Sequence, residues 1–394
     1  MAESAWSDML LPLPRLGANS MTDDKTSPVI EAASSDAERE AIYRFRYRVY
    51  VEEMNRYRSI ADHDGKRLVE PDDAQSHLYY AADGEAVVGT MRLTWGGDAP
   101  FTDRHIEQYD LAPFLEAVPQ DQMVIGERFM VERAYRGTDL IFRLFCSYLQ
   151  FVNERRIQLI FGDSEPHLLN LYQGLGFRTY SGKNVNSPET GYLIPLVMVP
   201  EDLDYMRTIK SPLCDVLQDF GEAAQMPACV PNLIEGGGAV TSQRLTARDA
   251  YWRDIKQALD INARKVQLFD GLSEDQALRC IGKSNLIECR RGDRLIKRGN
   301  VAQNMFVVVS GTLEVRDDEG DVVSWAGAGD IVGEMAFFLK SPRSMDVYAA
   351  TDDVRVLSLS ESVIKTMIEE DSTLAATLLL NVSKMLCYKL LNQA

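Results

Sequence analysis

Hydrophobic residues follow two different spacings along the first 200 residues, and each spacing predicts a different element. Residues 37–54 place apolar side chains at positions 42, 45 and 49, which is the spacing of an amphipathic helix. Residues 77–95 indicate two strands around an Asp83-Gly84 turn. We expect further strands at 123–132, 157–163 and 190–200, and helices at 138–156 and 165–177. The second of these helices would be stopped by Gly174 and Gly176.

The pattern changes twice beyond residue 200. Residues 225–243 contain two prolines and three consecutive glycines, which is typical of a connector, and helical patterns flank them at 202–222 and 246–265. From residue 286 onward, short β runs alternate with glycines, which favours a small barrel or jelly roll. An amphipathic helical pattern over 361–391 closes the chain.

A chain of 394 residues is too long for one ordinary core, so these patterns predict an α+β protein with more than one domain. We expect a mixed sheet flanked by helices at 31–205, a helical connector at 206–265, and a β-roll with flanking helices at 266–394. Residues 1–30, rich in Ser, Asp, Pro and Ala, are expected to form a disordered tail.

Composition excludes several classes of function. A hydrophobic content of 45% with 26% charged residues is that of a globular, water-soluble protein. No apolar run approaches the roughly 18 residues of a membrane-spanning helix, and no basic leader precedes one, so we expect a cytoplasmic protein without an integral membrane segment. A net charge of −17 disfavours nucleic-acid binding, which depends on Lys and Arg. The six cysteines lack metal-ligand spacing, which favours reduced thiols and no metal site.

The stretch Gly333 to Val347 contains the residue types that bind a nucleotide phosphate. Gly333 allows close approach of the backbone, Glu334 can accept hydrogen bonds from ribose hydroxyls, and Arg343 can pair with a phosphate as a planar fork. Ser344 adds a hydroxyl donor. A lone Gly-Glu pair would fit an ordinary turn between strands, with a solvated arginine, better than a nucleotide site.

Residues 268–394 resemble a cyclic nucleotide-binding domain, with "GEMAFFLKSPRS" in the place of the phosphate-binding cassette. The resemblance implies that Glu334 binds the ribose 2′-hydroxyl and that Arg343 binds the cyclic phosphate of cAMP or cGMP, with cAMP preferred. It assigns the nucleotide site to Gly333, Glu334, Met335, Ala336, Arg343 and Ser344.

Residues 40–200 resemble a GNAT acyltransferase. "LYQGLGF" resembles the closing helix of that superfamily, which implies that Tyr172 protonates the leaving thiolate. Arg136, Gly137 and Thr138 fall in the loop that binds the pyrophosphate of coenzyme A. Asp139 and Ile141 depart from the small residues expected there, which predicts a poor grip on that diphosphate.

A closer resemblance is to the autoinducer synthase and N-acyl amino acid synthase branch, carried by "FRYRVYVEEM", "EPDDAQSHLYYAADGEAVVGTMRLT" and "ERFMV". Those enzymes take long acyl chains, commonly from acyl carrier protein. The resemblance places substrate-binding roles on Arg46, Tyr50, Arg92, Arg128 and Phe129.

The acids of this region are the candidates for proton transfer and for acceptor binding. Glu127 is the candidate general base, and a merely salt-bridged acid is the open alternative. Asp72 and Asp73 are candidates to bind a polar or cationic acceptor, and a solvated loop is equally compatible. Arg44, Arg48, Arg56 and Arg58 fit a solvated helix face better than a docking face for an acidic carrier protein.

The sequence therefore predicts a cyclic-nucleotide-regulated N-acyltransferase that acts on an amino acid or related small amine, with acyl carrier protein or acyl-CoA as the donor. The alternatives are a cAMP-regulated protein lysine acetyltransferase using acetyl-CoA, and a non-catalytic sensor of acyl ligands and cyclic nucleotides. The pattern leaves open whether the chain is a monomer or a homodimer.

Overall fold

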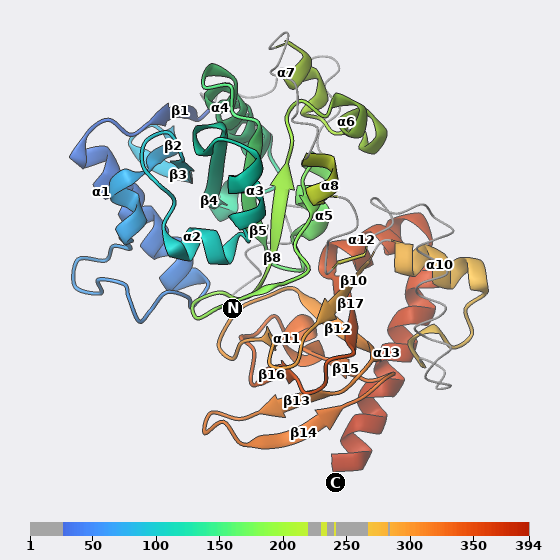
Figure 1. Ribbon diagram of the computed structural model, residues 1–394. Coiled ribbons are helices and arrows are strands. Elements are labelled where there is room, and N and C mark those ends of the chain that lie inside the picture. Colours follow the sequence, from blue (N-terminus) through green and yellow to red (C-terminus); the bar gives the residue numbers. More distant parts are fainter. Residues whose placement is uncertain (1–26, 220–229, 235–239, 242–266, 283, 394) are drawn as a thin grey trace.

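A computed structural model describes residues 27–219, 230–234, 240–241, 267–282 and 284–393 of the chain. Figure 1 shows an N-terminal domain built on a mixed sheet and a C-terminal domain built on antiparallel strands, with the long helix α13 (Ser372–Gln393) beside the second domain. This arrangement confirms the predicted fold class.

The N-terminal sheet has eight strands in the order β1-β2-β3-β4-β5-β8-β6, and β7 pairs with β8. Only β4 and β5 run parallel; the other pairs are antiparallel. The strands are β1 (Val29–Ala32), β2 (His77–Asp83), β3 (Ala86–Trp95), β4 (Met123–Val131), β5 (Leu159–Ser164), β6 (Arg178–Thr179), β7 (Val185–Ser187) and β8 (Gly191–Met198).

Helices cover both faces of this sheet because alternate residues of a strand point to opposite sides. From β4, Val124 and Met130 pack in the cluster that contains residues of α1 and α4, whereas Met123 and Ile125 pack with α3 and α8. The helices of this part are α1 (Asp36–Arg46), α2 (Asp103–Gln108), α3 (Ala112–Ala117), α4 (Leu140–Glu154), α5 (Leu169–Leu175), α6 (Leu203–Ile209), α7 (Cys214–Asp219) and α8 (Val230–Ile234).

The helix predicted at 37–54 is present, but it changes from an α-helix to a π-helix. After α1 the chain continues as a π-helix, η2 (Tyr47–Glu53), which buries Tyr47, Val49, Tyr50 and Val51. Such wide turns are uncommon and often occur at functional sites. Short 3₁₀ turns follow at η3 (Pro71–Gln75), η4 (Gln120–Gln122) and η5 (Arg133–Tyr135).

The C-terminal domain consists of two antiparallel sheets, ordered β15-β12-β17-β10-β9 and β11-β16-β13-β14. Its strands are β9 (Val240–Thr241), β10 (Asn285–Cys289), β11 (Arg294–Ile296), β12 (Asn304–Ser310), β13 (Leu313–Arg316), β14 (Val322–Ala326), β15 (Ile331–Val332), β16 (Asp346–Ala349) and β17 (Val354–Ser360). The remaining elements are η6 (Gln267–Phe269), α10 (Glu274–Gly282), α11 (Glu334–Leu339) and α12 (Glu361–Glu370).

Several predicted boundaries are corrected by the structure. Residues 29 and 30 belong to β1, so the proposed tail of 1–30 is too long; residues 1–26 lie outside the described part. The boundary at 205/206 cuts α6, which packs with α7 on the N-terminal domain through Met206 and Leu217. The pattern at 202–222 breaks at Lys210, whose backbone is left-handed, and the helix predicted at 246–265 is outside the described residues.

The structure also corrects the predicted ends of two helices. Helix α5 runs through Gly174 and ends at Gly176, whose φ of 124° suits only glycine comfortably. The predicted C-terminal helix divides at Asp371 into α12 and α13.

The described residues include one helix that is long and apolar enough to cross a membrane, Ser372–Leu391 of α13, with a mean hydropathy of 1.4. The sequence-based expectation of no such run was therefore too strict. Leu378, Val382 and Met385 of this helix lie in the core cluster of the C-terminal domain, whereas Leu380, Leu390 and Leu391 are exposed.

Candidate functional site

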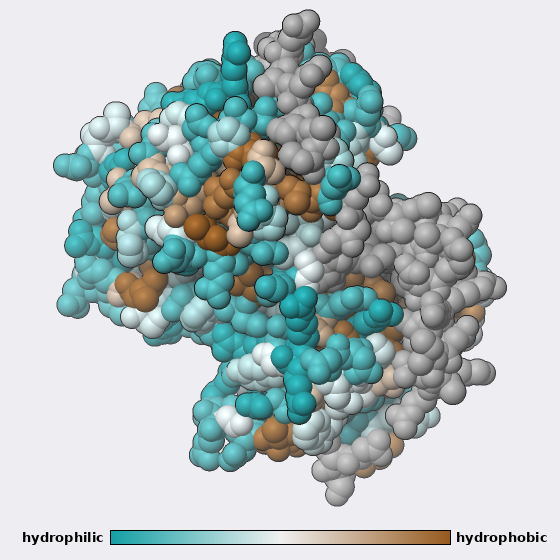
Figure 2. All heavy atoms as spheres, in the orientation of Figure 1, coloured by the Kyte–Doolittle hydropathy of each residue, from teal (hydrophilic) through white to brown (hydrophobic). Residues whose placement is uncertain are grey.

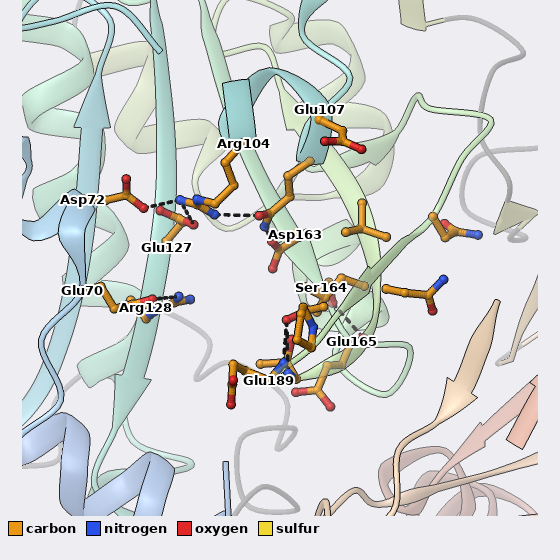
Figure 3. Close-up of a pocket in the computed structure, with 18 of the residues that line it drawn as sticks. Glu70, Asp72, Arg104, Glu107, Glu127, Arg128, Asp163, Ser164, Glu165 and Glu189 are labelled. Carbon is orange, nitrogen blue, oxygen red and sulfur yellow. Dashed lines mark hydrogen bonds and ion pairs between the residues drawn. The ribbon is translucent and has the colours of Figure 1, made fainter. Parts of the chain in front are cut away.

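Strands β4 and β5 pair over three residues and then separate. Their last paired residues are Ile125 and Phe161, and glycines follow on both strands. A Cβ at Gly126 would lie 2.8 Å from the ring of Tyr148, so only glycine fits there. Beyond this point the strands border a cavity of about 1060 Å³. Figure 3 shows Glu127 and Arg128 on one side of it and Asp163 on the other.

An apolar chamber opens from the same point between the strands. It is lined by Met91, Leu93, Phe145, Tyr148, Phe161, Gly162, Phe177 and Leu196. The chamber and the large cavity share Gly126, Glu127, Phe129, Asp163 and Tyr172. Its volume of about 20 Å³ holds one or two water-sized groups. A polar space and an apolar one therefore meet at Tyr172.

Four of the residues singled out in the sequence, Arg46, Asp73, Arg92 and Glu127, form a buried charge cluster beneath the cavity. Arg92, fully buried, lies 2.7 Å from Glu127, 3.1 Å from Asp73 and 3.2 Å from Glu70. Arg46 also contacts Asp73 at 2.7 Å. Buried charges need such partners, because an unpaired one is strongly destabilising. The cluster therefore fixes the positions of the carboxylates that face the cavity.

Glu127 is held as an ionised carboxylate. Burial alone would raise its pKa, but Arg92, Arg128 and Arg104 outweigh this and hold the pKa of Glu127 below its ordinary value. Tyr109 Oη also donates towards its Oε1 at 3.1 Å. A carboxylate stabilised in this way is a weak base, so the position of Glu127 at the cavity fits electrostatic positioning better than proton abstraction.

Arg128 has an unusual backbone conformation at the point where β4 borders the cavity. Its φ of 55° lies in the left-handed region, next to a shift in the pairing of β3 with β4. The guanidinium pairs with Glu70 and lies 4.9 Å from the ring centre of Tyr57 and 6.0 Å from that of Tyr50. Despite burial, Arg128 and Arg92 lower the pKa of Glu70 to about 2.

Asp72, His105 and Glu127 bring three possible metal ligands within 4.8 Å of one another. The guanidinium of Arg104 contacts all three: it pairs with Asp72, and lies 2.8 Å from His105 Nε2 and 3.6 Å from Glu127 Oε1. In this structure, the positive charge next to these three residues is therefore the guanidinium of Arg104.

Tyr172 lies where the two spaces join. Its ring is 5.6 Å from that of Phe177 and 6.4 Å from that of Phe145. Burial raises the pKa of Tyr172, which keeps the phenol neutral and able to donate a proton.

The predicted diphosphate loop is not arranged as an open anion site. Arg136 is buried, its guanidinium contacts Glu53 at 2.7 and 3.1 Å, and its Nε donates to Val131 O at 3.2 Å. Asp139 precedes the first residue of α4, Gly137 has a φ of 80°, and Thr138 Oγ1 donates to Tyr135 O at 2.7 Å.

The C-terminal cassette begins where β15 turns into α11. Gly333 has a φ of 79°, and a Cβ there would lie 2.4 Å from Arg343 Nη1. The guanidinium of Arg343 donates to Gly333 O at 2.6 Å, and to the carbonyl and side-chain oxygens of Asn304 at 2.5 and 3.0 Å. Glu334 is buried against Lys389 of α13, 2.7 Å from its Nζ.

The other predicted cassette residues differ in exposure: Ala336 is buried, whereas Met335 and Ser344 are exposed. The structure thus brings Gly333, Glu334 and Arg343 together. Both charged side chains are engaged by the chain's own groups at the positions where the resemblance places a nucleotide.

Family models match both regions. Residues 45–145 match the acetyltransferase (GNAT) domain, and residues 286–371 match the cyclic nucleotide-binding domain. The chain combines a GNAT acetyltransferase domain with a cyclic nucleotide-binding domain.

Relatives among known proteins match one part of the chain at a time. A cAMP-dependent protein kinase type II regulatory subunit from Drosophila melanogaster is 32% identical over 153 residues, which are 36% of this chain and 40% of that protein. A regulatory subunit from Mycosarcoma maydis is 35% identical over 103 residues, 24% of this chain and 20% of that protein. The chain thus spans less than half the length of these relatives.

Two solved structures are similar to parts of the chain. A CoA-dependent acyl-homoserine lactone synthase, BjaI, is 20% identical, with 49% of this chain and 98% of that chain covered and a TM-score of 0.38. A cyclic nucleotide-binding domain from Methylobacillus flagellatus is 20% identical, with 39% and 85% covered and a TM-score of 0.33.

The two domains are in direct contact beside the cavity. Asn300 Nδ2 of the nucleotide-binding domain donates to Thr190 O at 2.8 Å, and Arg56 of the acetyltransferase domain donates to Val301 O at 3.1 Å. Asn55 Nδ2 also donates to Gly299 O at 3.0 Å. A small cavity of about 30 Å³ at this contact is lined by residues of both domains, including Glu165, His167, Lys297, Asn300 and Arg343.

The contact changes the interpretation of the arginine run. Arg56 is buried in a two-pronged pair with Glu165, which lines both the large cavity and the small one. Arg44, Arg48 and Arg58 contact Glu40, Glu132 and Asn55. The run is therefore not one continuous face, since Arg56 points into the domain contact.

Sequence reasoning missed Asp163, Arg104 and Glu165, which line the cavity, and Tyr109, which is buried and hydrogen-bonds to Asp163. Asp163 and Glu165 could have been found, because Asp163 is the last residue of the buried strand predicted at 157–163 and Glu165 follows it by two residues. Arg104 and Tyr109 could not have been found in this way, because helix α2 was not predicted. Arg104 lies in α2, and Tyr109 directly follows it.

Proposed function

We propose that the chain transfers an acyl group from a thioester to the amine of an amino acid or related small molecule, under the control of a cyclic nucleotide. The observation that carries this proposal is the meeting of the apolar chamber with the polar cavity at Tyr172. One space suits the acyl group, and the other suits the amine and the polar arm of the donor.

The chemistry follows from that placement. The amine nitrogen attacks the thioester carbonyl carbon, the new C–N bond forms, and the C–S bond breaks. The thiolate leaves beside Tyr172, whose neutral phenol can supply its proton. Because the charge cluster around Arg92 fixes the carboxylates of the cavity, an amine can be held without movement of the sheet.

The small chamber favours a short acyl group over the long chain that the resemblance implies. A volume of about 20 Å³ accepts a long chain only if the surrounding aromatic side chains move. This observation gives a second candidate, acetyl transfer to a lysine amine. Against acetyl-CoA as the donor stands Arg136, which is buried against Glu53 instead of open to a diphosphate. We therefore keep acyl carrier protein as the proposed donor.

The domain contact supports regulation by the nucleotide-binding domain. The backbone of Arg343 is bonded to the segment Gly299–Asn304, with Arg343 N to Asn300 O at 2.9 Å and Gly299 N to Arg343 O at 2.8 Å. The same segment contacts Arg56 and Thr190 of the acetyltransferase domain. A cyclic phosphate that draws the Arg343 guanidinium from Asn304 O would therefore alter the wall of the cavity.

The experiment is a search for the product. Cells that overproduce the full chain, or its Tyr172→Phe variant, are compared by mass spectrometry of small-molecule extracts. We expect an N-acylated amine that accumulates with the wild-type chain and is reduced about 10²- to 10⁴-fold with the variant, the size of one acid–base contribution. If the two extracts contain the same amounts of N-acylated amines, and protein lysines are acetylated only with the wild-type chain, the second candidate would be favoured.

A further inference from the structure

The large cavity contains a partly buried acid that the mechanism above does not use. Asp163 is the penultimate residue of β5, and it lines both the polar cavity and the apolar chamber, as Glu127 does. Figure 3 shows it on the far side of the cavity from Asp72 and Glu70. It is therefore placed next to the point where the amine would meet the acyl group.

A single tyrosine hydroxyl bridges the two acids. Tyr109 Oη lies 3.1 Å from Glu127 Oε1 and 3.1 Å from Asp163 Oδ2. Gln108 Nε2 donates to both Tyr109 Oη, at 3.2 Å, and Asp163 Oδ2, at 2.7 Å. These hydrogen bonds hold the Tyr109 hydroxyl and the Asp163 carboxyl group in place.

Counting protons shows which acid is the better base. The hydroxyl of Tyr109 has one hydrogen, so it can donate to only one of two ionised carboxylates. The other carboxylate would then face an oxygen lone pair at 3.1 Å, which is repulsive. Since Arg92 and Arg104 hold Glu127 ionised, the network is fully satisfied when Asp163 carries a proton and donates it to Tyr109 Oη.

We infer that Asp163, and not Glu127, takes the proton from the acceptor amine. This inference rests on the proposed function. As the C–N bond forms, one N–H proton of the amine passes to Asp163 Oδ, while the thiolate released by C–S cleavage takes the proton of Tyr172. Protons are balanced over the cycle when Asp163 returns its proton to solvent and Tyr172 regains one. Tyr109 is a positioning residue in this step.

The surroundings of Asp163 support the assignment. Burial, and then the charge of Glu127, raise the pKa of Asp163, while Arg128 and the hydrogen bonds from Gln108 and Tyr109 oppose the rise. Groups from every neighbouring element face it, namely Tyr57, Gln108, Tyr109, Glu127, Arg128, Tyr172 and Tyr180. A carboxyl group with a raised pKa is the stronger proton acceptor of the pair.

The test is the pH dependence of kcat/KM for amide formation by the full chain. The wild-type value should rise with pH as Asp163 loses its proton and then level off. Asp163→Asn should remove this rise and lower the plateau about 10²- to 10⁴-fold. Glu127→Gln should keep the rise but move it to lower pH, because the charge that raises the pKa of Asp163 is gone.

The opposite pattern would overturn the inference: a rise abolished by Glu127→Gln and only displaced by Asp163→Asn makes Glu127 the base. Asp110→Asn is the matched control, since Asp110 lines the same cavity and accepts from Ser181 at 3.0 Å; it should keep the wild-type profile. Thermal unfolding of each variant separates loss of the base from loss of the fold. If no acyl donor yields an amide with the wild-type chain, the proposed function fails, and with it this inference; amide formation with an unchanged profile in Asp163→Asn overturns this inference alone.

Discussion

Lys389 of α13 pairs with Glu334, the acid that is expected to bind the ribose of the nucleotide. Removal of the Lys389 side chain should therefore strengthen nucleotide binding. Its Nζ lies 2.7 Å from Glu334 Oε1 and 3.4 Å from Ile331 O. The Glu334 side chain is 4% exposed and that of Lys389 is 40% exposed, so solvent weakens the pair on one side only. A nucleotide whose ribose hydroxyls bond to Glu334 must displace this ammonium group.

The magnitude follows from the exposure. A fully exposed pair contributes about 0–1 kcal/mol, and hydrogen bonds to a charged group contribute about 1.5–3 kcal/mol. A half-exposed lysine on a buried acid falls between these, at about 1 kcal/mol, which corresponds to roughly a fivefold change in affinity. Lys389→Ala should therefore lower the Kd for cAMP about fivefold.

Calorimetry on nucleotide-stripped full chain measures this directly. Lys384→Ala is the control, because Lys384 is exposed on the same helix and no contact of its side chain is involved in the argument. Weaker binding by Lys389→Ala would refute the reasoning and would mean that Lys389 contacts the nucleotide itself. Equal binding would mean that Glu334 does not have to release the lysine.

Two further predictions concern the donor and the acid stability of the cavity. Acyl carrier protein should support a higher kcat/KM than the matching acyl-CoA, because Arg136 is buried against Glu53; equal or better use of the CoA thioester contradicts this. The pKa of Glu70, about 2 when folded against an ordinary 4.5, corresponds to roughly 3 kcal/mol of stability that is present above pH 4.5 and lost as pH falls towards 2. Urea unfolding from pH 6 to pH 2.5 should show this loss, and Glu70→Gln should make the slope shallower; an identical slope would remove Glu70 from the account.

The sequence alone predicted the parts of the site that lie on regular, strongly patterned elements. Arg46, Asp73 and Arg92 were assigned to one site and do form one cluster, and Gly333, Glu334 and Arg343 also come together. Periodicity also predicted most central strands, because a buried strand has a continuous apolar pattern.

What the sequence did not reveal depends on contacts between distant segments. Tyr109 reaches Asp163 across 54 positions, and Lys389 reaches Glu334 across 55, and no local pattern records either pairing. The charge of Glu127 was visible in the sequence, but its low basicity depends on arginines at other positions of the chain. The contact of Asn300 with Thr190 likewise depends on how two folded domains pack.

The helical patterns predicted on either side of the connector do not provide the described contact between the domains. The pattern at 202–222 forms α6 and α7, which pack on the N-terminal domain, and the pattern at 246–265 lies outside the described residues. The described contact instead runs from Arg343 through Gly299–Asn304 to Arg56 and Glu165. An Arg343→Ala variant is therefore expected to disturb this contact as well as phosphate binding, because three hydrogen bonds of its guanidinium are lost.

The face of the molecule in Figure 2 is largely hydrophilic, with apolar patches over the N-terminal domain. Such a surface fits a protein of net charge −17 whose apolar chamber lies inside. Under the proposed function, the acyl group is bound in the interior of the sheet, where β4 and β5 separate, and the cyclic nucleotide acts through the domain contact beside it.

The measurement that tests this account most directly is single-turnover amide formation by purified, nucleotide-stripped chain, with an acyl-carrier thioester and a mixture of amino acids, in the absence and presence of cAMP. We predict an N-acyl product whose rate of formation changes about 5- to 150-fold on addition of cAMP, the range of coupling between linked sites. Saturating cAMP that binds but leaves the rate unchanged would contradict the coupling of the two domains. No amide with any thioester donor would contradict the assignment of the cavity to acyl transfer.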